Sequence, residues 1–173
     1  MRCSATCHST MTIRRYMVGE EPTIWSIYFR ATHETNADDY HKDLLNRWAP
    51  PDMDMTEWAT RLQEKNPFVA LLDDLIVGFA ELNESGFLDY FYVSPDFQRQ
   101  GIGSALMSAV VSEAITFEVP AITADVSITA RGFFAAHDFE VVESRTNIIL
   151  GHPAPNFAMV RHLTQPAANE ETP

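Results

Sequence analysis

The chain has 173 residues, a length typical of one domain, and 46% of them are hydrophobic, which is enough for a buried core. Its formal net charge of −12, from 24 acidic and 12 basic residues, argues against a nucleic-acid-binding protein, for which a basic face is expected. We see no run of 18 apolar residues, so the sequence predicts no membrane span, and a cytoplasmic location is the default expectation.

Both ends differ in composition from the rest of the chain. Residues 1–10 lack the apolar core of a signal peptide and hold the two cysteines, Cys3 and Cys7. Three potential metal ligands there, Cys3, Cys7 and His8, are weak evidence for a metal site, and we expect a disordered leader. The polar residues 164–173 are expected to form a disordered tail. Residues 11–163 then constitute the folded domain.

The first part of this domain reads as a short strand followed by three helices. Proline at position 22 suits a first helical turn, Asp39 is a candidate cap, and Asn66-Pro67 ends the third helix. The strand is expected at 12–16 and the helices at 21–32, 40–48 and 55–65.

Three strands follow in close succession and predict an antiparallel meander, because short turn sequences separate them. A long helix with an apolar stripe comes next, and the strand after it should lie parallel to the strand that ends at Val93. A last helix and a hairpin with a proline-rich loop at 151–156 complete the domain. The expected strands are 68–72, 75–82, 87–93, 121–126, 139–149 and 157–163, and the helices are 102–117 and 128–137.

The strongest chemical signal lies in residues 90–107, where a strand turns at Ser94-Pro95 and leads into a helix through Gly101-Ile102-Gly103. The first N–H groups of a helix have no internal acceptor and the helix dipole is positive there, so this is a candidate anion site. Glycines at 101 and 103 leave room for a phosphate. No Gly-Lys-Ser/Thr follows, and Leu106 replaces a third glycine, which excludes a P-loop and a dinucleotide fingerprint. The alternative is a tight turn without a ligand.

The spacing Val93-x-Pro95-x-x-Gln98-x-x-Gly101-x-Gly103 resembles the coenzyme-A loop of the GCN5-related N-acetyltransferase (GNAT) superfamily. A second stretch, residues 127–139, resembles the family sequence Asn-x-x-Ala-x-x-Phe-Tyr-x-x-x-Gly-Phe, with Ser127, Phe134 and Asp138 as departures. The resemblance extends over 11–163 and is nearest to bacterial members of the YafP-like kind. It implies that the pyrophosphate of acetyl-CoA is held by the backbone N–H groups of Gln98, Arg99, Gln100, Gly101, Ile102, Gly103 and Ser104.

The resemblance also implies a fold and a reaction. The fold would be α/β, with a mixed central sheet of six to seven strands and helices on both faces. The reaction would be direct transfer of an acetyl group from acetyl-CoA to a primary amine of a small molecule or peptide, without a metal. A homodimer is a further expectation from the family. Two alternatives remain open: a non-catalytic acyl-CoA-binding sensor or scaffold, and transfer of another acyl group or to a hydroxyl.

A protonated amine must lose its proton before it attacks a thioester, so the reaction calls for a base. Asp89 interrupts an apolar strand and is either that base or a hydrogen-bonded strand residue. Glu81 is either a second candidate base or a solvated charge. Alternation along the strand places Asp89 on the face of Phe91 and opposite to Tyr92, and either face could form the cleft.

By resemblance, the oxyanion would be bound by a backbone N–H of Phe91, Tyr92 or Val93. Many members have a tyrosine at the position of Phe134 that protonates the leaving thiolate; phenylalanine cannot, so the thiolate leaves unaided or another group such as Tyr92 serves. Phe134 is still expected beside the cofactor. Ser127 could bind the pantetheine arm, cap the following helix, or do both.

The acceptor side is expected to involve the first helices and residues 151–156. Tyr40, Trp48 and Trp58 could stack on a cation, although packing against the sheet is the more common use of such side chains. His137 is expected as a surface residue near a helix end. The sequence presents no Ser/His/Asp nucleophile pattern and no metal-ligand spacing.

Overall fold

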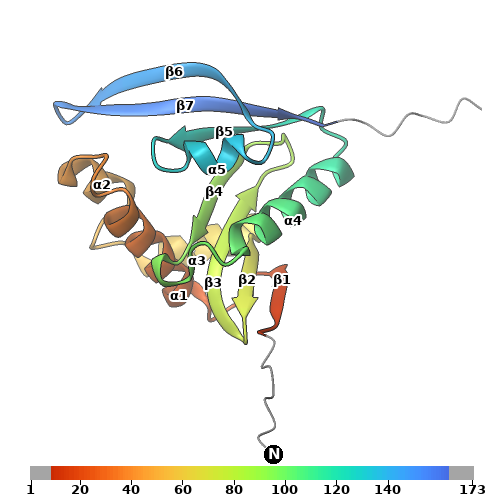
Figure 1. Ribbon diagram of the computed structural model, residues 1–173. Coiled ribbons are helices and arrows are strands. Elements are labelled where there is room, and N and C mark those ends of the chain that lie inside the picture. The colour runs from red at the N-terminus through yellow and green to blue at the C-terminus, as the bar shows by residue number, and fades with distance from the viewer. Residues whose placement is uncertain (1–8, 164–173) are drawn as a thin grey trace, which may run out of the picture.

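The computed structural model describes residues 9–163 and confirms the predicted α/β fold class (Figure 1). The predicted leader up to residue 8 and the predicted tail, 164–173, lie outside the described residues. Thr10 is tied to the domain, because its N–H donates to Asp73 Oδ1 over 2.8 Å and its carbonyl accepts from the Asp73 N–H over 3.0 Å. Within 9–163, no helix combines the length and apolar character needed to cross a membrane.

The first sheet has four antiparallel strands in the order β1-β2-β3-β4. Both residues of the turn between β2 and β3, Asp73 and Asp74, have positive φ, so this connection is the tight hairpin that the sequence predicted. The bounds are Met11–Arg15 for β1, Phe68–Leu72 for β2, Leu75–Leu82 for β3 and Leu88–Val93 for β4.

The second sheet is antiparallel and has the order β5-β7-β6, with bounds Ala121–Ser127, His152–His162 and Glu140–Ile149. The prediction of a loop at 151–156 was wrong, because the hairpin turns at Leu150-Gly151 and β7 starts at His152. Pro153 and Pro155 fit there because β5 pairs with β7 only from Asn156 onward. The proline-containing end of β7 therefore pairs with β6 alone, and proline is tolerated in such an edge segment.

Helices cover the two faces of the first sheet separately (Figure 1). One core joins α1 and α3 to Val69, Leu71 and Phe79, and the other joins α4 to Ala70 and Val77. A π-helical segment, Ala31–Thr35, prolongs α1, while α2 packs against the β6–β7 hairpin. The bounds are Glu21–Arg30 for α1, Lys42–Trp48 for α2, Met55–Lys65 for α3, Ile102–Thr116 for α4 and Arg131–Ala135 for α5.

The expected parallel pairing of β4 with β5 is limited to their starting ends. One parallel bridge joins Phe87 to Thr123, and the Thr123 N–H donates to the Gly86 carbonyl over 2.9 Å. A Cβ at Gly86, which has φ of +84°, would lie 2.5 Å from the Ala121 carbonyl oxygen, so the junction requires glycine. Beyond it the two strands belong to separate sheets.

Candidate functional site

A cleft of about 730 Å³ lies where β4 and β5 separate. Phe91 and Val93 of its lining belong to the core beneath α4, whereas Tyr90 and Tyr92 belong to the core beneath α1. A single cavity can contact both faces of a strand only by passing around its edge. The unpaired edge of β4 is therefore part of the cleft wall.

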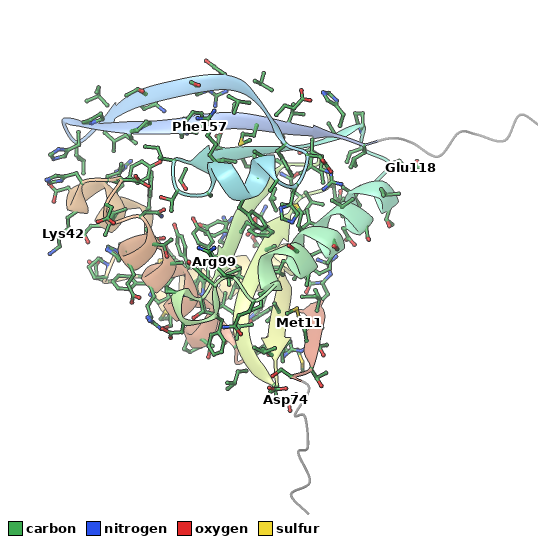
Figure 2. All side chains as sticks on the ribbon, in the orientation of Figure 1. Met11, Lys42, Asp74, Arg99, Glu118 and Phe157 are labelled. Carbon is green, nitrogen blue, oxygen red and sulfur yellow. The ribbon has the colours of Figure 1, made fainter. Side chains whose placement is uncertain are left out.

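One end of the cleft lies at the start of α4. Gly101 caps this helix with φ of +83°, which favours glycine, and the N–H groups of Ile102, Gly103 and Ser104 have no acceptor within residues 9–163. The exposed Arg99 contributes a positive charge to the loop (Figure 2). Of the predicted coenzyme-A loop, all residues except Gln100 line the cleft: Gln98, Arg99, Gly101, Ile102, Gly103 and Ser104.

Gly103 has a structural role that the sequence did not reveal. A Cβ at this position would lie 2.8 Å from Cε2 of Phe133, which itself lines the cleft. The absence of a side chain at Gly103 thus makes room for the Phe133 ring as well as for a ligand.

His137 lies two residues beyond the end of α5, near a helix end as expected, and it is half-buried where it lines the cleft. Its Nδ1 lies 2.8 Å from the Phe133 carbonyl oxygen, and its Nε2 lies 3.1 Å from Ser104 Oγ. Because a carbonyl can only accept, Nδ1 carries a hydrogen and donates it there, while Nε2 shares a hydrogen bond with the Ser104 hydroxyl. The histidine thereby joins α5 to the first turn of α4.

A β-bulge places Asp89 at the cleft. Glu81 of β3 is opposite Tyr90 and Leu82 is opposite Leu88, so Asp89 has no partner in the register. The predicted alternation is wrong here, because Leu88 shares the core of Phe91 rather than that of Tyr90.

Both candidate bases bind one arginine, Arg61 of α3. Its Nη2 donates to Glu81 Oε1 over 2.8 Å and to Asp89 Oδ2 over 2.7 Å. The Glu81 side chain is 4% exposed and does not line the cleft, whereas the Asp89 side chain is 44% exposed and does. Burial raises the pKa of Glu81, while Arg61 acts in the opposite direction. The sequence held one signal that Arg61 faces the sheet: it follows the buried Trp58 by three positions and so lies on the same face of α3.

Tyr92 lies half-buried beside Tyr28, with their rings at 4.7 Å in an edge-to-face arrangement. The Tyr28 hydroxyl donates to the Trp48 carbonyl over 2.6 Å. Burial raises the pKa of Tyr92, and the nearby charges of Tyr90 and Asp89 add to this effect. Tyr92 therefore keeps its proton and can act as a hydrogen-bond donor.

Phe134 and Ser127 both line the cleft, as does Asn156, which the sequence analysis had placed in a loop. Phe134 packs edge-on against Phe139 at 5.0 Å and against Phe91 at 5.7 Å. Ser127 Oγ accepts the Ala130 N–H over 3.2 Å and so caps the turn before α5. Asn156 is opposite Ser127 in the β5–β7 register, and its Oδ1 is buried without a hydrogen-bond partner in the described chain.

The three aromatic residues proposed to hold a cation have separate places. Trp58 is fully buried in the core beneath α1. The Tyr40 hydroxyl donates to the Pro155 carbonyl over 2.7 Å and accepts the Ile128 N–H over 2.8 Å. It therefore links β7 to the residue that directly follows β5. Of the three, only Trp48 lines the cleft, near Tyr28.

Comparison with known proteins identifies the family. A model of the acetyltransferase (GNAT) domain matches residues 36–148. The chain belongs to this family. This GNAT protein is therefore an acetyltransferase that uses acetyl-CoA as co-substrate, and the chemistry of the family needs no metal ion.

Individual relatives agree with this assignment. The chain is 28% identical over 151 residues to YafP, an uncharacterized N-acetyltransferase of Escherichia coli (strain K12), covering 87% of this chain and 95% of YafP. It is also 28% identical to a GCN5-related N-acetyltransferase of Rhodopseudomonas palustris, with a TM-score of 0.82 and coverage of 90% and 97%. YncA of Salmonella typhimurium, solved with its cofactor acetyl-CoA, shares the fold at 18% identity, with a TM-score of 0.72 and coverage of 95% and 100%.

Proposed function

We propose that this GNAT protein transfers the acetyl group of acetyl-CoA directly to a primary amine of a small molecule or peptide. The observation that carries the proposal is a single cleft that connects the free N–H groups at the start of α4 to the Asp89 carboxylate around the open edge of β4. One end suits a pyrophosphate and the other suits a proton acceptor.

The cofactor arm would lie along the open edge of β4. The N–H groups of Ile102, Gly103 and Ser104 would bind the pyrophosphate, with Arg99 adding charge. Farther along, the unpartnered Asn156 Oδ1 could accept an amide N–H of the pantetheine. Ser127, opposite Asn156, keeps a hydroxyl hydrogen to donate, and the apolar wall around Phe134 would contact the acetyl end. Gln100 is exposed and outside the cleft, so we assign it no direct contact.

In the chemical step the amine nitrogen attacks the thioester carbonyl carbon. A C–N bond forms, the C–S bond breaks, and coenzyme A leaves as a thiolate. Asp89 receives the amine proton, directly or through water, because it is the candidate carboxylate that reaches the cleft. A backbone N–H of Phe91, Tyr92 or Val93 stabilises the oxyanion. Glu81 is a positioning residue that holds Arg61, and the Tyr92 hydroxyl donates to the thiolate.

Charge and aromatic surface support an amine acceptor. The exposed carboxylates of Asp89 and Asp125 both line the cleft. Each binds an arginine through one oxygen, Asp89 to Arg61 and Asp125 to Arg145, and the second oxygen of each remains to attract a cation. Trp48 and Tyr28 offer aromatic surface on the side of α1 and α2.

The test compares Gly103→Glu with Gly103→Gln by calorimetric titration with acetyl-CoA. Both side chains crowd Phe133 to a similar extent, but only glutamate brings a negative charge to the anion site. We expect glutamate to weaken binding at least about tenfold more than glutamine, and less so at high salt. Equal affinities would exclude the start of α4 as the pyrophosphate site.

A separate assay tests the transfer reaction. Acetyl-CoA is incubated with a panel of primary amines, alcohols and peptides, and released coenzyme A is measured with a thiol reagent. Amine-dependent release is expected. Tight acetyl-CoA binding without release for any acceptor would contradict the transfer reaction and leave the cofactor assignment intact.

A further inference from the structure

Three metal-ligating side chains meet outside the cleft: His41 and Asp43 at the start of α2, and His152 at the start of β7. One ligand atom from each lies within 4.8 Å of the others. Figure 1 shows α2 beneath the turn of the β6–β7 hairpin, and Figure 2 labels Lys42, which separates the two α2 ligands in sequence. More than a hundred residues separate His152 from the other two along the chain, so the sequence alone gave no ligand spacing.

The distances suit a small tetrahedral cation. Asp43 Oδ2 lies 3.4 Å from His152 Nε2 and 3.6 Å from His41 Nδ1. Two ligand atoms that are each about 2.05 Å from a tetrahedral Zn²⁺ lie about 3.3 Å apart. The cluster therefore needs only small side-chain movements to bind such an ion.

The required movement can be identified. The two imidazole rings stack at 3.6 Å with an interplanar angle of 11°, so one ring must tilt before both nitrogens point at the same ion. The His41 side chain is 52% exposed and that of His152 31% exposed, which leaves room for the tilt. His41 Nδ1 would give up the Asp43 N–H, whose bond is long at 3.3 Å and therefore weak.

The cluster also lacks a permanent cation. In the described part of the chain, the Asp43 carboxylate has the two imidazoles as its ion-pair partners and no lysine or arginine. An imidazole balances this charge only when it is protonated, whereas a divalent ion would engage all three ligands.

We propose that His41, Asp43 and His152 form a binding site for a divalent transition metal, with Zn²⁺ as the best fit and the fourth position open to water. Two nitrogen donors and one carboxylate favour Zn²⁺, Cu²⁺ or Ni²⁺ over Mg²⁺ and Ca²⁺. None of the three residues lines the cleft, so the metal does not take part in acetyl transfer. It ties α2, which carries Trp48, to β7, which carries Asn156, and both of those residues line the cleft.

The experiment is a calorimetric titration of the full chain with ZnCl₂. It uses the Cys3→Ser/Cys7→Ser/His8→Ala background, because those side chains could bind zinc independently. We expect one Zn²⁺ per chain with a micromolar Kd, and no binding of Mg²⁺. Zinc at tenfold excess over Kd should raise Tm by about 3–6 °C. Added Co²⁺ should give the visible absorption of a tetrahedral nitrogen and oxygen site.

The variants His152→Ala and Asp43→Asn should each weaken zinc binding at least about tenfold. His162→Ala, at the other end of the same strand, is the matched control and should leave binding unchanged. His41→Gln replaces His152→Ala if the latter does not fold, as judged by acetyl-CoA binding. Absence of zinc binding up to about 1 mM, or an equal loss in the His162→Ala control, would overturn the proposal.

Discussion

Arg61 of α3 binds both candidate carboxylates near the cleft, Glu81 and Asp89. Its Nη2 donates to both carboxylates, and its guanidinium carbon lies 4.4 Å from the Tyr90 ring centroid. The Glu81 carboxylate is paired with Arg61 and almost fully buried, whereas the Asp89 carboxylate is exposed to the cleft although it also binds Arg61. Exposure thus favours Asp89 over Glu81 as the proposed base, although both carry the same chemical group.

Asp89→Asn should lower kcat by about a hundredfold or more and change the KM for acetyl-CoA less than about threefold, since the amide cannot accept the amine proton. Steady-state measurement of coenzyme A release provides both constants. Asp52→Asn, an exposed carboxylate outside the cleft, should leave both unchanged. An unaltered kcat together with a lower Tm would show that Asp89 is only structural.

Tyr92→Phe should lower kcat with little change in acetyl-CoA affinity. Burial raises the pKa of Tyr92, so the phenol stays protonated beyond pH 10, and its ionisation should cause no loss of rate below that pH. The ratio of wild-type to variant kcat should then stay constant from pH 7 to pH 9. Tyr90→Phe is the neighbouring control. A Tyr92→Phe variant with the wild-type kcat across this pH range would exclude Tyr92 as the donor.

At the scale of elements, local signals in the sequence were sufficient where a turn residue ended each segment. Asp73-Asp74 and Asn66-Pro67 set the bounds of β2, β3 and α3 correctly. The prediction of a loop at 151–156 was wrong because proline usually interrupts a strand. Here this part of β7 pairs with β6 alone, and the sequence does not show that its other side is unpaired. The last predicted helix is confined to Arg131–Ala135 because turns occupy its flanks.

The site shows the same division between local and distant information. The glycine loop was recognisable because its residues are contiguous, and the candidate base stood out as a charge within an apolar strand. Arg61, Asn156 and the position of His137 depend on contacts between segments that are far apart in sequence. No periodicity within one segment encodes such contacts, so only the fold could reveal them.

Asp54 caps α3 and provides a test of stability at this scale. Its Oδ1 accepts the Thr56 N–H over 2.7 Å, and this bond, with the one from the Glu57 N–H, lowers the pKa of Asp54 from its usual value. Asp54→Ala should reduce Tm by about 2–4 °C at pH 7, measured by circular dichroism. Since a lowered pKa stabilises the fold only while the group is ionised, the difference should shrink as the pH falls through the folded-state pKa. Asp54→Asn keeps a hydrogen-bond acceptor at the cap and should lower Tm less than Asp54→Ala does.

At the scale of the whole molecule, two antiparallel sheets meet at the Gly86–Phe87 junction. Gly86→Ala adds strain at positive φ and a clash with the Ala121 carbonyl, so we expect a loss of about 2 kcal/mol or more in the free energy of unfolding. Urea denaturation measures this loss. Gly132→Ala is the matched control, because its new methyl group would meet no atom within 4 Å and Ala suits a helix. Equal free energies of unfolding for Gly86→Ala and Gly132→Ala would mean that the contact between Gly86 and β5 can relax to accept a side chain.

The cleft around the open edge of β4 also bears on the order of events during turnover. Because it is lined from both faces of the strand, the thioester and the acceptor can approach from opposite sides and meet at the edge. Neither substrate has to leave before the other enters, so initial-rate plots at several fixed acceptor concentrations should intersect rather than run parallel. The same geometry allows a bisubstrate inhibitor, an amine joined to coenzyme A through a short acyl bridge, to occupy both approaches at once.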